Sequence, residues 1–122
     1  MNAQQVKTTD NYMVANGTSL QGYVRTTYAQ LVALFGEGMG AGDKTTAEWI
    51  LEFDDGTVAT IYDWKELETP MGPYNWHVGG KRGTIVVAMV QDVLDGVIEV
   101  VDAFWSMKDE ETDDEDMEYY GA

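Results

Sequence analysis

The chain has 122 residues, with 22 Asp and Glu against seven Lys and Arg, which gives a net charge of −15 at pH 7. This length is typical of one domain, and a hydrophobic share of 44% is enough for one buried core. The lack of cysteine excludes disulfides, thiolate catalysis and zinc sites built on Cys, and the single histidine excludes a two-His metal site. The charge also argues against a general nucleic-acid binder, because phosphate contacts need clustered Lys and Arg.

The first third of the chain predicts a flexible start, a strand and a short helix. Residues 1–16 are polar and aperiodic, so we expect a flexible N-terminal segment, and residues 19–24 resemble a short strand. Thr27 and Gln30 then fit a capping box, in which the threonine hydroxyl accepts a backbone N–H at the start of a helix. Gly36 fits the left-handed position at the end of that helix.

The middle of the chain predicts a β-hairpin. Asp55-Gly56 separates two strand-like runs, residues 46–53 and 57–64, and Asp-Gly is a strong hairpin signal because the turn requires positive φ. A two-residue turn and a three-residue turn through Asp54 both fit the sequence. The two turns differ by one residue in register, and the sequence leaves the choice open.

The segment Tyr-Asn-Trp-His-Val-Gly-Gly predicts a third strand over residues 74–78, which the two glycines would close. Its tryptophan offers a stacking surface, its histidine can donate or accept a hydrogen bond, and its glycines let a ligand approach the backbone. One interpretation is a pocket for a planar or anionic ligand such as a nucleotide. The plainer one is a strand end with a core tryptophan, a surface histidine and a turn. The candidate ligand-binding residues are Trp76, His77, Gly79, Gly80 and Arg82, with Trp49 or Tyr62 as a stacking partner.

Residues 85–107 predict a long helix that begins after Thr84. Apolar residues recur there at three- and four-residue steps, and acids fall on the opposite side with the same period. The valines of this segment suit a strand equally well, but the period of the acids favours a helix. Four acids exclude a membrane span of this length. The acids of this stripe are Asp92, Asp95, Glu99 and Asp102.

The last 15 residues carry eight acids and one lysine, so they repel one another and have nothing to bury. We expect residues 108–122 to form a disordered acidic tail after a single domain over residues 17–107. The predicted fold class is α+β, with an antiparallel three- to four-stranded sheet, one short helix and one long C-terminal helix. The candidate partner-binding acids of the tail are Asp109, Glu110, Glu111, Asp113, Asp114, Glu115 and Asp116.

Catalytic and metal-binding motifs are absent from the sequence. It contains no Ser–His–Asp signature, phosphate-binding glycine loop or HExxH motif, so we expect no enzymatic activity and no cofactor. Glu48, Asp63 and His77 are a legitimate ligand set for some transition metals. Their proximity depends on the hairpin register, and Lys65 is a simpler counter-charge, so we expect no metal site.

Several short motifs, taken together, resemble a family of small proteins in tailed-phage genomes. The motifs are TSLQGYV at residues 18–24, DKTTAEW at 43–49, DGTVATIY at 55–62 and WHVGG at 76–80. The resemblance covers residues 18–80, about half of the chain, and implies a phage origin without assigning an activity. Small acidic phage proteins of this composition resemble inhibitors of host defence and of DNA-handling enzymes, several of which imitate DNA.

These observations predict a non-enzymatic phage inhibitor in the host cytoplasm, of the anti-CRISPR or counter-defence kind. Its stripe and tail would act as a DNA mimic on the basic surface of a host protein, with no direct contact to nucleic acid or membrane. Two alternatives stay open: a sponge for a small molecule or signalling nucleotide, and a virion or replication accessory protein whose acidity serves solubility. The apolar stripe of residues 85–107 is wider than a small sheet needs, so a homodimer through this helix is a further expectation.

Overall fold

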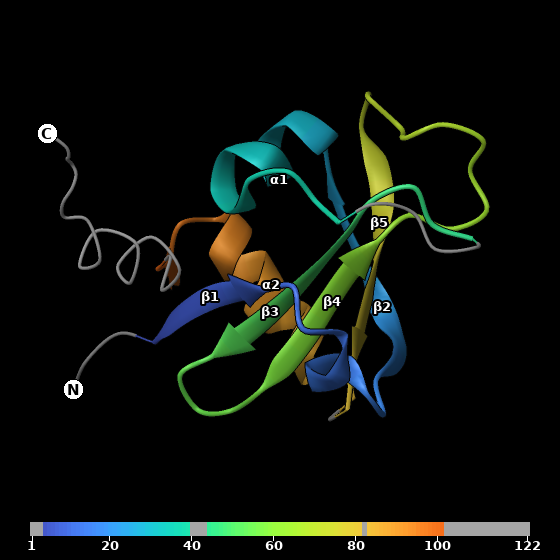
Figure 1. Ribbon diagram of the computed structural model, residues 1–122. Helices are drawn as coiled ribbons and strands as arrows, with labels where there is room; N and C mark the ends of the chain where they lie inside the picture. Colours follow the sequence, from blue (N-terminus) through green and yellow to red (C-terminus); the bar gives the residue numbers. More distant parts are fainter. Residues whose placement is uncertain (1–3, 40–43, 82, 102–122) are drawn as a thin grey trace, which may run out of the picture.

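The computed structural model describes residues 4–39, 44–81 and 83–101, which form a six-stranded sheet with two α-helices and a short 3-10 helix (Figure 1). The predicted α+β class is confirmed. None of the helices in the described residues is long and apolar enough to cross a membrane. The elements in chain order are β1 (Gln5–Thr9), η1 (Tyr12–Ala15), β2 (Ser19–Thr26), α1 (Tyr28–Phe35), β3 (Glu48–Phe53), β4 (Val58–Tyr62), β5 (Tyr74–Gly80), α2 (Ile85–Leu94) and β6 (Glu99–Val100).

The sheet is larger than expected and is not purely antiparallel. Its strand order is β2-β5-β4-β3-β1-β6, in which β1 and β6 run parallel and the other neighbours run antiparallel. The two additional strands come from segments expected to be flexible or helical. Residues 5–9 join the sheet because Val6, paired with Phe53, inserts its side chain into the core and is 1% exposed.

The hairpin between β3 and β4 has the three-residue turn that the sequence left open. Gly56 has φ +89° and donates its N–H to the carbonyl of Phe53 at 2.9 Å. Glu52 therefore pairs with Val58, one residue away from the register of a two-residue turn. The shift decides which side chains share a face, because alternate residues of a strand point to opposite sides.

Helix α1 forms as its capping residues predicted. The Thr27 hydroxyl accepts the backbone N–H of Gln30 at 3.2 Å, and Gly36 ends the helix with φ +80°. The Gln30 side chain bonds the hydroxyl of Thr26 instead of reaching back to the capping residue. The cap thus satisfies one orphan N–H, and Leu31 on the next turn is fully buried.

The prediction of one helix through residues 85–107 is wrong over residues 95–101, because α2 ends at Leu94. Gly96 follows in the left-handed conformation, with φ +82°, and the carbonyl of Asp92 accepts the N–H groups of Val97 and Ile98. This closure uses up the last carbonyls of the helix and turns the chain into β6. Thr84 occupies the N-cap position but makes no side-chain capping bond. Residues 102–107 and the tail lie outside the described residues.

The two faces of the sheet differ in what covers them. Helix α2 packs against β2, β5 and β4 and lies behind the sheet in Figure 1, whereas η1 contacts β3 and β4 in front of it. We call the side of α2 the inner face and the opposite side the outer face. In the described part of the apolar stripe proposed for a homodimer, Val86, Val90 and Val93 are fully buried against the chain's own sheet, whereas Val97 is 64% exposed.

Candidate functional site

Strand alternation separates the predicted ligand-binding residues onto opposite faces. Neighbouring residues of β5 point to opposite sides of the sheet. A Cβ on Gly80 would meet the Val86 side chain of α2 at 2.7 Å, so Gly80 and Trp76 belong to the inner face. His77 and Gly79 consequently belong to the outer face. One pocket cannot contain all the candidates.

Both candidate tryptophans belong to the core, which for Trp76 is the plainer interpretation of the sequence. Trp76 is 0% exposed, and its ring lies 5.6 Å from that of Trp49 and 5.2 Å from that of Tyr74, both edge to face. Trp49 donates its indole N–H to the carbonyl of Gly36 at 2.9 Å. Edge-to-face aromatic pairs of this kind stabilise a core by more than the burial of their apolar area alone. Arg82 lies outside the described residues.

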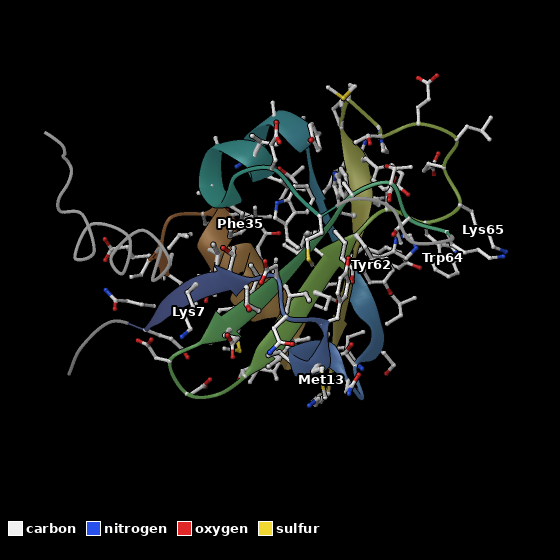
Figure 2. The ribbon with its side chains drawn as sticks, viewed as in Figure 1. Lys7, Met13, Phe35, Tyr62, Trp64 and Lys65 are labelled. Carbon is white, nitrogen blue, oxygen red and sulfur yellow. The ribbon has the colours of Figure 1, made fainter. Side chains whose placement is uncertain are left out.

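A second group of rings lies on the outer face, and we call Tyr23, Tyr62, Trp64 and His77 the outer aromatic cluster. The rings of Tyr62 and Trp64 meet edge to face at a centroid distance of 6.2 Å (Figure 2). The imidazole of His77 lies 5.3 Å from Tyr62 and 4.8 Å from Tyr23. Trp64 is 42% exposed. The cluster therefore offers aromatic surface to solvent, unlike the inner rings.

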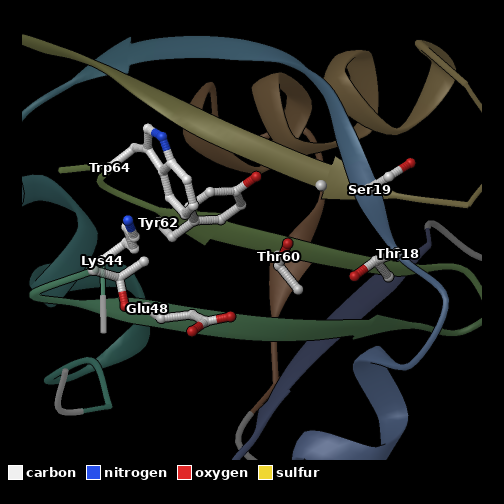
Figure 3. A pocket seen from close by; sticks show the side chains of 9 residues that line it. Thr18, Ser19, Lys44, Glu48, Thr60, Tyr62 and Trp64 are labelled. Atoms are coloured by element: carbon white, nitrogen blue, oxygen red, sulfur yellow. The ribbon is translucent and has the colours of Figure 1, made fainter. Parts of the chain in front are cut away.

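A cavity of about 410 Å³ opens beside this cluster, which is a size typical of small-ligand sites. In Figure 3, Tyr62, Trp64 and Lys44 lie at one end, Thr18 and Ser19 lie at the other, and the Glu48 side chain extends between them. A Cβ on Gly79 would clash with the Thr60 hydroxyl, so bare backbone forms that part of the wall. The lining residues are Thr18, Ser19, Lys44, Thr45, Glu48, Thr60, Tyr62, Trp64 and Gly79.

Burial shifts the pKa values of the titratable groups at the site. Burial raises the pKa of Glu48, and the Glu48 carboxylate has no hydrogen-bond or ion-pair partner within the described part of the chain. The pKa of Tyr62 is raised by burial and, secondarily, by the Glu48 charge. Burial lowers the pKa of His77 against the opposing charges of Asp63 and Glu66, and its Nδ1 is buried without a hydrogen-bond partner among the described residues. The site thus combines a carboxylate that has no partner among the described residues with an imidazole whose neutral form is favoured by burial.

Asp63 does not contribute to the cavity. It is fully buried, and its Oδ1 accepts the backbone N–H groups of Thr46 at 2.7 Å and Ala47 at 3.3 Å. The hydroxyl of Thr46 donates to the other oxygen. No group of three or more acids and histidines in residues 4–39, 44–81 and 83–101 is placed to hold a metal ion. Asp63 is thus a structural residue that fixes the start of β3 against the end of β4.

The acids of the predicted stripe do not form one helix face. Asp92 is half-buried in the last turn of α2, and Asp95, just after the helix, accepts the side-chain amide of Gln91 at 3.0 Å. Glu99 lies in β6 and accepts the side-chain amide of Gln5 at 3.2 Å. The remaining candidates fall outside the described residues. They are Asp102, Asp109, Glu110, Glu111, Asp113, Asp114, Glu115 and Asp116.

Sequence reasoning missed most of the cavity. Glu48 was considered only as a metal ligand, although the three-residue turn makes it the cross-strand partner of Tyr62 on the outer face. The register of the three-residue turn was the one sequence feature that could have placed Glu48 beside Tyr62. Nothing in the local sequence indicates that Lys44, Thr18 and Trp64 converge, because they lie in connections or at a strand boundary and are brought together by the tertiary fold.

Comparison with known proteins gives no assignment. No protein-family model and no curated protein matches the chain. The resemblance to tailed-phage proteins therefore stays a prediction, and the function has to be inferred from the chemistry of the outer face.

Proposed function

We propose that this chain is a non-enzymatic binding protein that holds a small planar ligand in the outer-face cavity. The observation that carries the proposal is the combination of exposed aromatic rings with an unpaired carboxylate around a cavity of about 410 Å³. Binding sites for small molecules are typically concave and apolar, with a few polar groups that fix the ligand's orientation. The hydroxyls of Thr18, Ser19 and Thr60 supply such polar groups.

The phage resemblance suggests a biological setting for this binding. A small protein made in the host cytoplasm can act as a sponge, which lowers the free concentration of a signalling molecule by binding it. A nucleotide used in host immunity is a ligand of suitable size and shape, because its base can stack on Tyr62 or Trp64. Sequestration needs no catalytic group, in keeping with our expectation that the protein is not an enzyme.

We expect Trp64→Ala to weaken ligand binding by about tenfold to a hundredfold, because aromatic stacking contributes about 1–3 kcal/mol per base. Ligands released from the heated protein can be identified by mass spectrometry, and their affinities can be measured by calorimetry. Tyr12→Ala is the matched control, since Tyr12 is also an exposed ring, 54% against 42% for Trp64, but does not line the cavity. A protein that releases no ligand and binds none of a nucleotide panel contradicts the proposal, and so does ligand binding that Trp64→Ala leaves unchanged.

A second candidate function is the acidic inhibitor that would bind a basic surface of a host protein. The net charge of −15 favours it, because a field of that size accelerates encounters with cations. The acids of the predicted stripe do not share one helix. The inhibitor hypothesis therefore depends on Asp92, Asp95 and Glu99 as separate charges and on the acids of residues 102–122.

We expect such a complex to weaken roughly tenfold or more from low to high salt, because screening shortens the range of surface charges. Affinity for a host partner captured by the full chain can be measured across a salt series. The control is a variant with the tail acids changed to Asn and Gln. If the affinity changes neither with salt nor with neutralisation of the tail, this candidate function is contradicted. The proposal for the cavity is unaffected by that result.

A further inference from the structure

Glu48 is a charged residue of the cavity whose carboxylate has no hydrogen-bond partner among the described residues. Its carboxylate is half-buried, lies between the aromatic end and the hydroxyl end, and accepts no hydrogen bond from any described residue (Figure 3). A carboxylate taken out of water needs donors to replace the lost hydration. Lys44 is the only cation among the nine lining residues, and it does not contribute to the shift of the Glu48 pKa, which burial alone raises. A bound molecule that offers N–H donors would therefore replace water at this carboxylate.

On the basis of the proposed ligand-binding function, we infer that the ligand carries two parallel N–H donors on the edge of a flat group, and that Glu48 accepts both. A guanine base has this pattern, as does an amidinium group. An ionised carboxylate has two oxygens and is an acceptor only, so it matches paired donors in a bidentate geometry. An adenine edge, with one donor beside an acceptor, does not match it.

The surrounding rings suit the same ligand. Tyr62 is the cross-strand partner of Glu48, so an aromatic ring lies beside the carboxylate on the same face. A flat group bound to the carboxylate can therefore contact the ring system of Tyr62 and Trp64. Burial lowers the pKa of His77 and so favours its neutral form, which does not compete as a cation for the carboxylate.

Guanosine and inosine provide the decisive pair of probes, because inosine lacks only the exocyclic amino group. We expect the wild-type protein to bind guanosine about tenfold to a hundredfold more tightly than inosine, since one hydrogen bond to a charged acceptor is lost. Glu48→Gln should reduce this preference to about one, because Gln offers a single acceptor oxygen next to an NH₂ donor. Calorimetry gives both affinities for each variant.

The matched control is Glu52→Gln. Glu52 lies on the same strand and face as Glu48, is also half-buried and does not line the cavity, so this variant should keep the wild-type preference. Far-UV circular dichroism and the urea midpoint check that both variants fold. Benzamidine against benzamide is a second arm, which tests the amidinium source of the same donor pattern.

The outcomes separate the inference from the proposed function. A preference for guanosine that depends on Glu48 supports the inference with a nucleobase as the ligand group. A preference for benzamidine that depends on Glu48, without guanosine binding, supports it with an amidinium group. If neither probe shows a preference that Glu48→Gln removes, the inference is overturned. Ligand binding that still depends on Trp64 would then leave the proposed function in place.

Discussion

Trp76→Ala should destabilise the protein by about 4 kcal/mol, the cost typical of removing a large aromatic ring from a core. The side chain is 0% exposed. Its ring centroid lies within 6.4 Å of the ring centroids of Trp49, Tyr74 and Tyr28. Alanine would leave a cavity that these three rings cannot fill together. Because small domains have only about 5–15 kcal/mol of stability, a large fraction of the variant should be unfolded at moderate urea. Urea denaturation followed by far-UV circular dichroism measures the loss.

Trp76→Phe distinguishes the ring from its N–H group. The indole Nε1 of Trp76 is buried and has no hydrogen-bond partner in the described part of the chain, and an unpaired buried donor costs about 1–3 kcal/mol. Phenylalanine keeps an aromatic ring and removes that donor, so we expect it to cost less than about 1.5 kcal/mol. A loss as large as that of alanine would contradict this account, because it would mean that the N–H is satisfied in the folded protein.

The fold was predictable where one local signal dominated. Thr27 and Gly36 mark the ends of α1 through capping and positive φ, and Asp55-Gly56 marks the hairpin. The end of α2 was missed because the helical period of the acids continues past Gly96, whose positive φ follows the end of the helix. Residues 97–101 then satisfy a strand pattern, with Ile98 buried and Glu99 exposed.

The partners of β1 could not be predicted from local sequence. Only Val6 is buried in this strand, and it pairs with Phe53, which is 47 residues away in the chain. A polar strand with one apolar anchor has no periodicity that separates it from a loop. Its position is set by the open edge of β3, a feature that exists only after the hairpin has formed.

Strand geometry explains why only part of the candidate site was predicted from the sequence. Trp76 and His77 are neighbours in sequence, so both were assigned to one pocket, yet neighbours on a strand point to opposite faces. The correct grouping is across strands, where Glu48, Tyr62 and His77 share the outer face through the registers of β3, β4 and β5. Knowing the turn length at Gly56 would have been enough to place Glu48 beside Tyr62.

Asp63→Ala should cost about 3 kcal/mol, because the variant loses three hydrogen bonds to a charged acceptor and leaves buried donors unpaired. The carboxylate accepts from the N–H groups of Thr46 and Ala47 and from the Thr46 hydroxyl. These bonds hold the segment that carries Lys44, a cavity-lining residue, so the variant should also bind ligand more weakly. Urea denaturation and calorimetry with the ligand measure the two effects.

Asp63→Asn tests whether the acceptor geometry or the charge holds this segment. The amide oxygen of asparagine can still accept both backbone N–H groups, and its NH₂ can donate to the Thr46 hydroxyl, which in turn can donate to Thr69 at 2.7 Å. We therefore expect a cost of about 1 kcal/mol and nearly unchanged ligand binding. If asparagine were as damaging as alanine, the negative charge would be the essential property. Asp63 would then be part of the electrostatics of the outer face, beside His77, and not only a fastening for Thr46 and Ala47.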